Sequence, residues 1–167
     1  MTNSKTKITK NPEKRELIIE RVIRAPLALV WDSWTKPEHI AKWWGPKGWS
    51  TTVLRMDVQP SGVWHYCMQP EEGGLEAWGR ATYHEVDDLS RLIFTDASSD
   101  GDGRVTKGTE MLTTVEFIPQ GKAQTKLIIR TQFATADKLE SADGMGMVEG
   151  FIETLNRLED LLGKSSG

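Results

Sequence analysis

Few side chains in this sequence could carry acid–base, nucleophilic or metal chemistry. The three histidines, His39, His65 and His84, lack the close spacing of metal ligands. A single cysteine, Cys67, excludes an internal disulfide and a site built from several cysteine ligands. The sequence contains no phosphate-binding loop, dinucleotide fingerprint or serine-hydrolase elbow. We therefore predict no catalytic residues, no metal site and no cofactor.

The aromatic residues favour a different chemistry, the binding of an apolar molecule. The chain has seven tryptophans, and three of them fall in the segment KWWGPKGWS at residues 42–50. A turn usually lies at the surface, where large apolar side chains gain little. Trp43, Trp44 and Trp49 therefore either cover a core from its edge or wall a pocket. We predict that this turn closes one end of a sheet and that part of it faces a cavity.

A second candidate wall lies in the segment VWHYCMQ at residues 63–69. Alternation along a strand puts Trp64, Tyr66 and Met68 on one face, with His65 and Cys67 on the other. We expect the larger apolar set to face inward. Tyr66 then brings a hydroxyl into an apolar space, where it is either satisfied within the core or orients a ligand.

The next predicted strand, within residues 75–86, leaves its inward face ambiguous. One parity groups Trp78 with Arg80, and the other groups Gly79 with Tyr83. If Trp78 and Arg80 face inward, the guanidinium could meet an anionic group of a ligand. Otherwise Arg80 is an ordinary solvated or salt-bridged side chain, because arginine is rarely fully buried.

These residues need a scaffold, and the hydrophobic pattern predicts an α+β fold. A first strand at 16–24 is followed by two short helices, 26–35 and 37–44, each opening at a proline. Strands joined by short turns continue to Phe133, and a helix is predicted over 135–162. Such strands pair antiparallel, so we predict a curved antiparallel sheet of six to seven strands wrapped on the long C-terminal helix. The first part of that helix contributes Met147, Phe151 and Leu155 as candidate cavity contacts.

The composition is that of one ordinary soluble domain. The chain has 167 residues, a charged fraction of 27% and a net charge of −3, which gives no electrostatic case for nucleic acid or membrane as partner. We expect a flexible lead-in over 1–15, one domain over 16–162 and a flexible tail over 163–167. Because no signal peptide or membrane span is evident, we expect a cytoplasmic location.

Four segments carry a resemblance to a known family. The sequence is similar to bacterial proteins of the Hsp90-ATPase-activator-homologue type, of the START/Bet v 1-like (SRPBCC) superfamily, through APLALVWDSWTKPEHIAKWWGPKGW, MDVQPSGVWHYCM, RLIFTD and GMGMVEGFIETLNRLEDLL. The likeness covers about residues 16–162. It implies a helix-grip fold with a cavity between the sheet and the long helix, which in related proteins holds apolar or aromatic small molecules.

The preferred function is therefore non-enzymatic binding of an apolar or aromatic small molecule. The residues predicted to contact it are Trp43, Trp49, Trp64, Tyr66, Met68, Trp78, Arg80, Met147, Phe151 and Leu155. One alternative is a polyketide-cyclase-like enzyme, hydrolase or isomerase, for which Tyr66, His84 and Arg80 are the candidate acid–base groups. Another is a chaperone-associated or regulatory interaction protein. We expect no nucleic-acid or membrane partner. The sequence is compatible with a homodimer.

Overall fold

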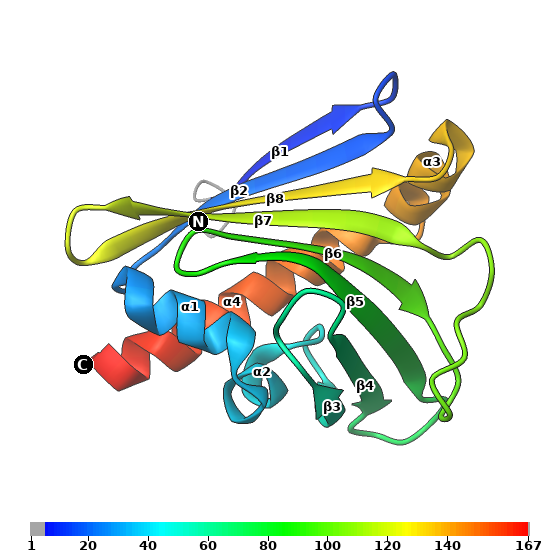
Figure 1. Ribbon diagram of the computed structural model, residues 1–167, viewed down its shortest axis with the longest axis horizontal. Helices are drawn as coiled ribbons and strands as arrows, with labels where there is room; N and C mark the ends of the chain where they lie inside the picture. Colours follow the sequence, from blue (N-terminus) through cyan, green and yellow to red (C-terminus); the bar gives the residue numbers. More distant parts are fainter. Residues whose placement is uncertain (1–5, 167) are drawn as a thin grey trace.

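An eight-stranded antiparallel sheet and four helices make up the computed structural model, which describes residues 6–166, with side chains through residue 163 (Figure 1). The strands are β1 (Thr6–Asn11), β2 (Glu16–Ile23), β3 (Trp49–Met56), β4 (Val63–Pro70), β5 (Ala77–Asp87), β6 (Arg91–Ser98), β7 (Met111–Gln120) and β8 (Gln124–Phe133). The helices are α1 (Leu27–Thr35), α2 (Pro37–Trp43), α3 (Ala136–Gly144) and α4 (Met147–Ser166). The predicted α+β class, antiparallel sheet and two short helices after the predicted first strand, which is β2, are confirmed. The sheet has eight strands where six to seven were predicted, because β1 precedes β2.

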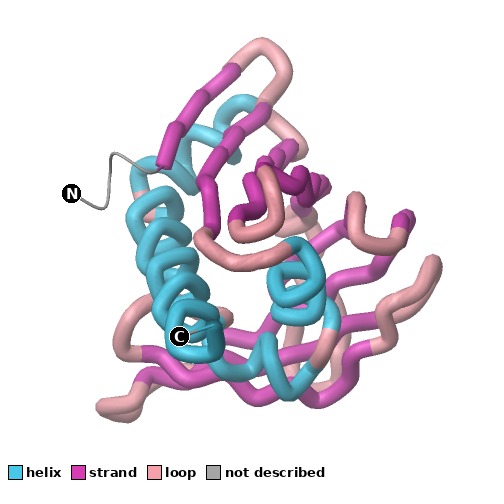
Figure 2. Tube along the Cα trace, turned by 90° about the vertical axis from the view of Figure 1, so that its left-hand side faces the viewer, coloured by secondary structure: helices cyan, strands magenta, loops and turns pink. Residues whose placement is uncertain are grey.

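The sheet curves, and its inner face holds the core. Its strand order is β1-β2-β8-β7-β6-β5-β4-β3, so β2 pairs with β8 and the sheet stays open at β1 and β3. Irregular registers occur in β3 between Val53 and Arg55 and in β5 between Tyr83 and Glu85. Such bulges bend a strand and increase its twist. Figure 2 shows the resulting sheet bending around the helices.

The N-terminal segment differs from the prediction of a flexible lead-in over residues 1–15. Residues 6–11 form β1, which pairs antiparallel with β2 from Thr6↔Arg21 to Asn11↔Glu16. Its side chains are mostly exposed, because β1 lies at the edge of the sheet. A strand of this kind has no buried alternating face, so the hydrophobic pattern gave no signal for it. Residues 1–5 of the predicted lead-in lie outside the described residues.

The C-terminal segment was predicted as one helix over 135–162 and is two helices. Thr135 caps α3 as expected, since its hydroxyl oxygen accepts a hydrogen bond from the Lys138 N–H at 3.1 Å. The break between α3 and α4 falls at Gly146, whose φ of +84° is in the left-handed region that favours glycine. Helix α4 continues to Ser166, into the segment predicted as a tail over 163–167.

One end of the space between α4 and the sheet is densely filled. Helices α1 and α2 enter there and bury Val30, Ile40 and Trp43 without exposure to solvent. Leu158 of α4 is likewise fully buried. At the edge of this region Arg21 Nη2 of β2 donates to Glu159 Oε1 of α4 at 2.6 Å, and both side chains are at most 9% exposed. Among the described residues, no helix combines the length and apolar character needed to cross a bilayer.

Candidate functional site

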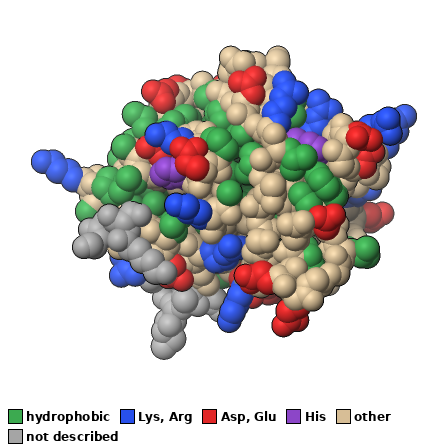
Figure 3. Space-filling view, turned by 90° about the horizontal axis from the view of Figure 1, so that it is seen from below, with side chains coloured by type: hydrophobic (Ala, Val, Ile, Leu, Met, Phe, Trp, Pro, Cys, Tyr) green, Lys and Arg blue, Asp and Glu red, His purple; other side chains and the backbone are tan. Residues whose placement is uncertain are grey.

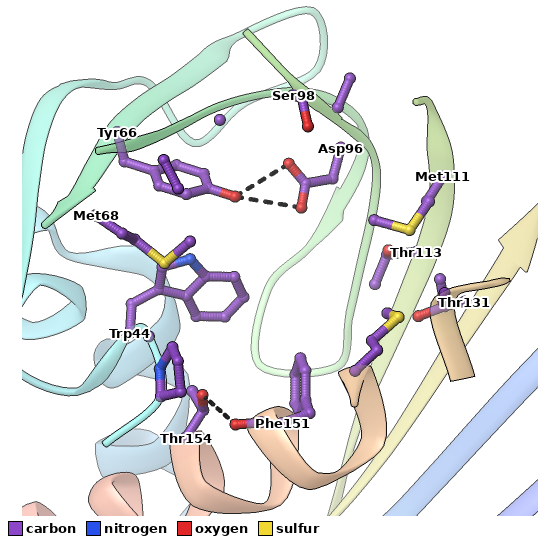
Figure 4. A pocket seen from close by; sticks show the side chains of 18 of the residues that line it. Trp44, Tyr66, Met68, Asp96, Ser98, Met111, Thr113, Thr131, Phe151 and Thr154 are labelled. Atoms are coloured by element: carbon purple, nitrogen blue, oxygen red, sulfur yellow. Dashed lines mark hydrogen bonds between the residues drawn. The ribbon is translucent and has the colours of Figure 1, made fainter. Parts of the chain in front are cut away.

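A cavity of about 530 Å³ lies between the inner face of the sheet and the first half of α4 (Figure 4). Its walls come from β4 to β8, from α1, from the turn between α2 and β3, and from the junction of α3 and α4. The side chains in these walls are mostly apolar. The space is therefore continuous with the core, but side chains do not fill it.

Aromatic rings form one wall of the cavity. The Trp44 ring is 6.1 Å from the Tyr66 ring and 6.1 Å from the Phe151 ring, with edge-to-face angles of 82° and 89°. Trp34 lies behind Trp44 at 5.7 Å, and Phe94 also borders the space. Edge-to-face packing of this kind holds rings in fixed orientations. The wall is therefore a stable apolar surface that an aromatic or aliphatic ligand could contact.

At one end of this aromatic wall, Tyr66 meets an aspartate, Asp96. The Tyr66 hydroxyl donates to the two carboxylate oxygens of Asp96 at 3.3 and 3.4 Å, as Figure 4 shows. Gly79 on β5 makes this contact possible, because a Cβ at that position would overlap the Tyr66 ring. The absence of a side chain lets the ring lie across β5 and reach β6. The strand pairing Tyr66↔Gly79 gives the same placement.

Burial changes the acidity of both groups. Removal from water raises the pKa of Asp96 to about 7, although hydrogen bonds from Tyr66 and from the Ala97 N–H favour its ionised form. Burial, with a further contribution from the negative charge of Asp96, raises the pKa of Tyr66 well above its ordinary value. Near neutral pH, Asp96 therefore exists in both protonation states, while Tyr66 keeps its proton. A carboxyl group with this pKa could give or take a proton or pair with a cation.

Two threonines supply further polar groups of the wall. Thr113 of β7 and Thr131 of β8 are paired neighbours, and each is at most 8% exposed. Neither hydroxyl hydrogen-bonds to another side chain or to the backbone within the described part of the chain. Thr154 differs, since its hydroxyl donates to the Gly150 carbonyl at 2.9 Å. Thr113 and Thr131 are thus available to a bound molecule.

The structure brings half of the predicted site residues to the cavity. Those that border it are Tyr66, Met68, Trp78, Met147 and Phe151. Trp43, Trp64 and Leu155 are instead fully or almost fully buried in the core, and the Trp43 indole N–H donates to the Ser33 carbonyl at 2.8 Å. Trp49 does not border the cavity. Trp44, in the same turn, does.

In β5, whose inward face the sequence left ambiguous, the set that contains Gly79 and Tyr83 faces inward. Gly79 and Tyr83 are buried on the inner face, and Arg80 points outward, where its Nη1 donates to the Gly103 carbonyl at 3.0 Å. Trp78 borders the cavity, but its ring packs on the outer face, 5.5 Å from the His65 ring. His84 is exposed and hydrogen-bonds to Thr95. The prediction that Arg80 meets a ligand inside the cavity is therefore not supported by its position.

Asp96 is the main residue that the sequence reasoning missed. It lies two residues after Phe94 in RLIFTDAS, so strand alternation from Leu92 and Phe94 places it on the inner face. Following that alternation past the last apolar residue would have found it. Arg157 was also missed. Its Nη1 donates to the carbonyls of Gly45 at 2.7 Å and Trp49 at 3.1 Å, which fastens the tryptophan-rich turn to α4.

No group of three or more His, Cys, Asp or Glu side chains among the described residues is arranged to hold a metal ion. On the face seen in Figure 3, basic, acidic and apolar side chains are intermixed. The candidate site is thus the cavity itself, with Asp96, Tyr66, Thr113 and Thr131 among its polar groups.

Comparisons with known proteins give the chain its family. Its fold matches a crystal structure of a Mycobacterium smegmatis protein with a TM-score of 0.85 and 25% identity, covering 94% of this chain and 96% of that one. A Nitrosomonas europaea protein matches with a TM-score of 0.79 and 29% identity, covering 92% and 97% of the two chains. A Staphylococcus epidermidis protein matches with a TM-score of 0.82 and 28% identity, covering 95% of this chain and 94% of that one.

A search of curated proteins found no match. Residues 24–163 match the family described as "Activator of Hsp90 ATPase homolog 1-like protein". This match spans most of the sequence and agrees with the resemblance carried by the tryptophan-rich turn and the C-terminal helix. The protein therefore belongs to the Activator of Hsp90 ATPase homolog 1-like family.

Proposed function

We propose that this protein binds an apolar or aromatic small molecule in the cavity between the sheet and α4. The observation that carries the proposal is a cavity of about 530 Å³ with predominantly apolar walls. Ligand sites commonly measure ~300–1,000 Å³ and combine apolar walls with a few polar groups. Transfer of a ligand from water to such walls is favourable by ~25 cal/mol for each Å² of apolar surface buried.

Small residues border the cavity at positions where larger side chains would fill it, which supports a binding role for this space. Strands β5 and β7 present Gly79 and Thr113 to the cavity, where leucine or phenylalanine would fill it. Helix α4 presents Gly150, at which an added Cβ would come no closer than 4.0 Å to the Pro46 Cβ. Interiors otherwise pack to the density of organic crystals, with few voids larger than a water molecule. A space of this size, bordered by small residues on several elements, is the expected form of a binding site.

The test is binding of the neutral fluorophore N-phenyl-1-naphthylamine, followed by its emission and by quenching of tryptophan fluorescence. Thr113→Phe places a ring in the cavity and should weaken binding at least ~10-fold, as loss of most buried contact area would require. Thr114→Phe is the matched control, because Thr114 is the adjacent threonine on the opposite face of β7. It should bind like the wild type. Failure of the wild type to bind, or equal binding by Thr113→Phe, would contradict the proposal.

A second candidate function is acid–base catalysis on a small apolar substrate, as in a cyclase or isomerase. Asp96 favours it, because a carboxyl group with a pKa of about 7 sits inside the cavity beside a tyrosine hydroxyl. General acids and bases work best with pKa values near the working pH. Among the groups first considered, His84 and Arg80 face outward, which leaves Asp96 and Tyr66 for this role.

Proton abstraction can be measured directly with 2-tetralone, an aromatic ketone, by NMR detection of deuterium uptake next to its carbonyl in D₂O. Acid–base catalysis predicts uptake faster than with Asp96→Asn at the same ligand occupancy. Equal rates of deuterium uptake with the wild type and with Asp96→Asn would contradict acid–base catalysis. The proposed binding function would be unaffected.

A further inference from the structure

We propose that the preferred ligand carries a single ammonium group on an apolar body, and that Asp96 is its counter-ion. This inference rests on the proposed binding function and adds to it the chemical class of the ligand. It starts from the charges in the cavity wall. Of the described residues that border the cavity, Asp96 is the only one with an acidic side chain, and none is lysine, arginine or histidine.

The surroundings of Asp96 leave its charge without a cationic partner. Its carboxylate accepts a hydrogen bond from Tyr66, and it forms no ion pair with any residue in the described part of the chain. The titratable groups that face it are Tyr66 from β4 and Tyr83 from β5, and both are neutral near pH 7. From β7 it faces Met111, its register partner, which has no charge. Asp96 is half-buried in a mostly apolar wall, where a charge is normally paired, so a cation supplied by a ligand would complete this site.

Aromatic rings around the same space suit a cation as well. Trp44 lies between the rings of Tyr66 and Phe151, and Figure 4 shows it below the Tyr66–Asp96 pair. Ring faces attract ammonium groups, most strongly those of tryptophan. The Thr113 hydroxyl has no other hydrogen-bond partner among the described residues and could accept from a primary ammonium. One carboxylate, several ring faces and a free hydroxyl are a suitable set of contacts for a desolvated ammonium group.

The same contacts disfavour a ligand that carries a negative charge. A fatty acid or other carboxylate would bring a second negative charge beside Asp96, and no lysine or arginine among the described wall residues would offset it. A neutral ligand would gain the apolar contacts but not the charge-assisted hydrogen bond, which is roughly twice as strong as a neutral one. The expected order of affinity is therefore ammonium, then neutral, then carboxylate.

Three probes with nearly the same apolar body test this order by titration calorimetry at pH 8. They are 2-naphthylmethylamine, 2-naphthalenemethanol and 2-naphthoate. The ammonium should bind ~10-fold or more tighter than the alcohol, as a charge-assisted hydrogen bond in an apolar site implies. The carboxylate should bind more weakly than the alcohol. Because the wild type alone gives this comparison, the test does not depend on a variant that folds.

Substitutions then assign the preference to one side chain. Asp96→Asn keeps the shape and should remove the ~10-fold advantage of the ammonium while changing alcohol binding less than ~3-fold. Asp102→Asn removes the same charge from an exposed loop position, 79% exposed at its side chain, and should leave all three affinities unchanged. Tyr66→Phe keeps Asp96 and should keep the preference for the ammonium.

A quaternary analogue, 2-naphthylmethyl-trimethylammonium, keeps its charge at every pH. Any change of its affinity with pH therefore reports titration of the protein and not of the ligand. Its affinity should rise roughly 10-fold from pH 5 to pH 8 and then level, because a protonated Asp96, like asparagine, offers the cation no counter-charge. If the alcohol binds and neither ammonium binds more tightly, the inference is overturned and the binding function stands. If no probe binds, both fail.

Discussion

The two ends of α4 face the same sheet and differ in what lies between helix and sheet. At the filled end, Leu155, Leu158 and Leu162 are at most 3% exposed and pack near α1 and α2. At the hollow end, Met147 and Phe151 border a cavity of about 530 Å³. The short helices account for part of the difference, because Trp43 of α2 is fully buried in the core, whereas Trp34 of α1 and Trp44 after α2 reach only the wall of the cavity. The helix and sheet set the width of the space, and α1 and α2 determine how much of it is filled.

The two ends also differ in how their acidic side chains are paired. At the filled end Glu159 is paired with Arg21 at 2.6 Å and also with Arg24 at 3.4 Å. At the hollow end the half-buried Asp96 has Tyr66 as its side-chain partner and no ion pair to a described residue. A paired buried charge is compatible with a purely structural role, whereas an unpaired one destabilises the fold. We infer that the filled end serves stability and that the hollow end trades stability for binding.

The largest expected effect comes from removing apolar volume at each end of α4. Leu158→Ala should lower the free energy of unfolding by ~2–5 kcal/mol, because a fully buried leucine leaves a cavity. Met147→Ala removes a side chain of similar size that already borders open space, and should cost less than ~1 kcal/mol. Urea denaturation of both variants measures the difference. Equal losses would show that the two ends are packed alike.

The second prediction concerns Asp96 and pH. Its folded pKa of about 7 lies above the value of about 3.9 for an unfolded aspartate, so the folded state binds more protons between these pH values. Stability from this group is therefore present below about pH 4 and is lost as the pH rises to about 7. Asp96→Asn should be more stable than the wild type by on the order of 2–4 kcal/mol at pH 8.

The comparison at low pH provides its control. At pH 4 Asp96 is protonated in the folded state, so Asp96→Asn and the wild type should differ by less than ~0.5 kcal/mol. Urea unfolding at the two pH values measures both differences. A variant that is less stable than the wild type at pH 8 would mean that the carboxylate is well solvated or paired, contrary to the hollow-end description.

The third prediction inserts bulk at each end. Leu155→Trp should destabilise the protein by ~1–3 kcal/mol, because Leu155 is fully buried in a filled core. Thr113→Phe adds volume that the cavity can accept and should change stability by less than ~1 kcal/mol. Thermal unfolding distinguishes them. If Leu155→Trp leaves stability unchanged and Thr113→Phe lowers it, the packing around Leu155 is looser than the packing around Thr113, which contradicts the description of the two ends.

Much of the fold follows from the sequence where a hydrophobic period is clear. Alternation in β2, β7 and β8 and the two proline-led helices were predictable because each buries one face. Strand β1 was not, because it is an exposed edge whose pairing depends on β2. The break at Gly146 was not located either. A glycine in a helical pattern is compatible with both a weakened helix and a helix end, and tertiary packing decides between them.

The site was less predictable than the fold, for reasons seen in particular residues. The sequence identifies large aromatic residues but not which of them a cavity exposes, so Trp43 and Trp44 are indistinguishable until α2 is placed. Leu155 shares the apolar stripe with Phe151, yet it falls one turn into the filled end. Asp96 was overlooked because a polar residue on an inward strand face contradicts the pattern that defines that face. Such an exception is expected at a functional site.

The smallest expected effects come from two glycines of the C-terminal segment, at the wall of the hollow end. Gly150 lies inside α4, and an added Cβ would meet only the Pro46 Cβ, at 4.0 Å. Gly150→Ala should therefore stabilise the protein by ~0.5–1 kcal/mol, the gain in helix propensity. Gly146→Ala is the matched control, because the same methyl group at a φ of +84° should cost ~1–2 kcal/mol. Denaturant midpoints of the two variants should move in opposite directions. If Gly150→Ala is instead destabilising, the Pro46 turn packs against α4 more closely than described, and this wall of the hollow end belongs to the filled core.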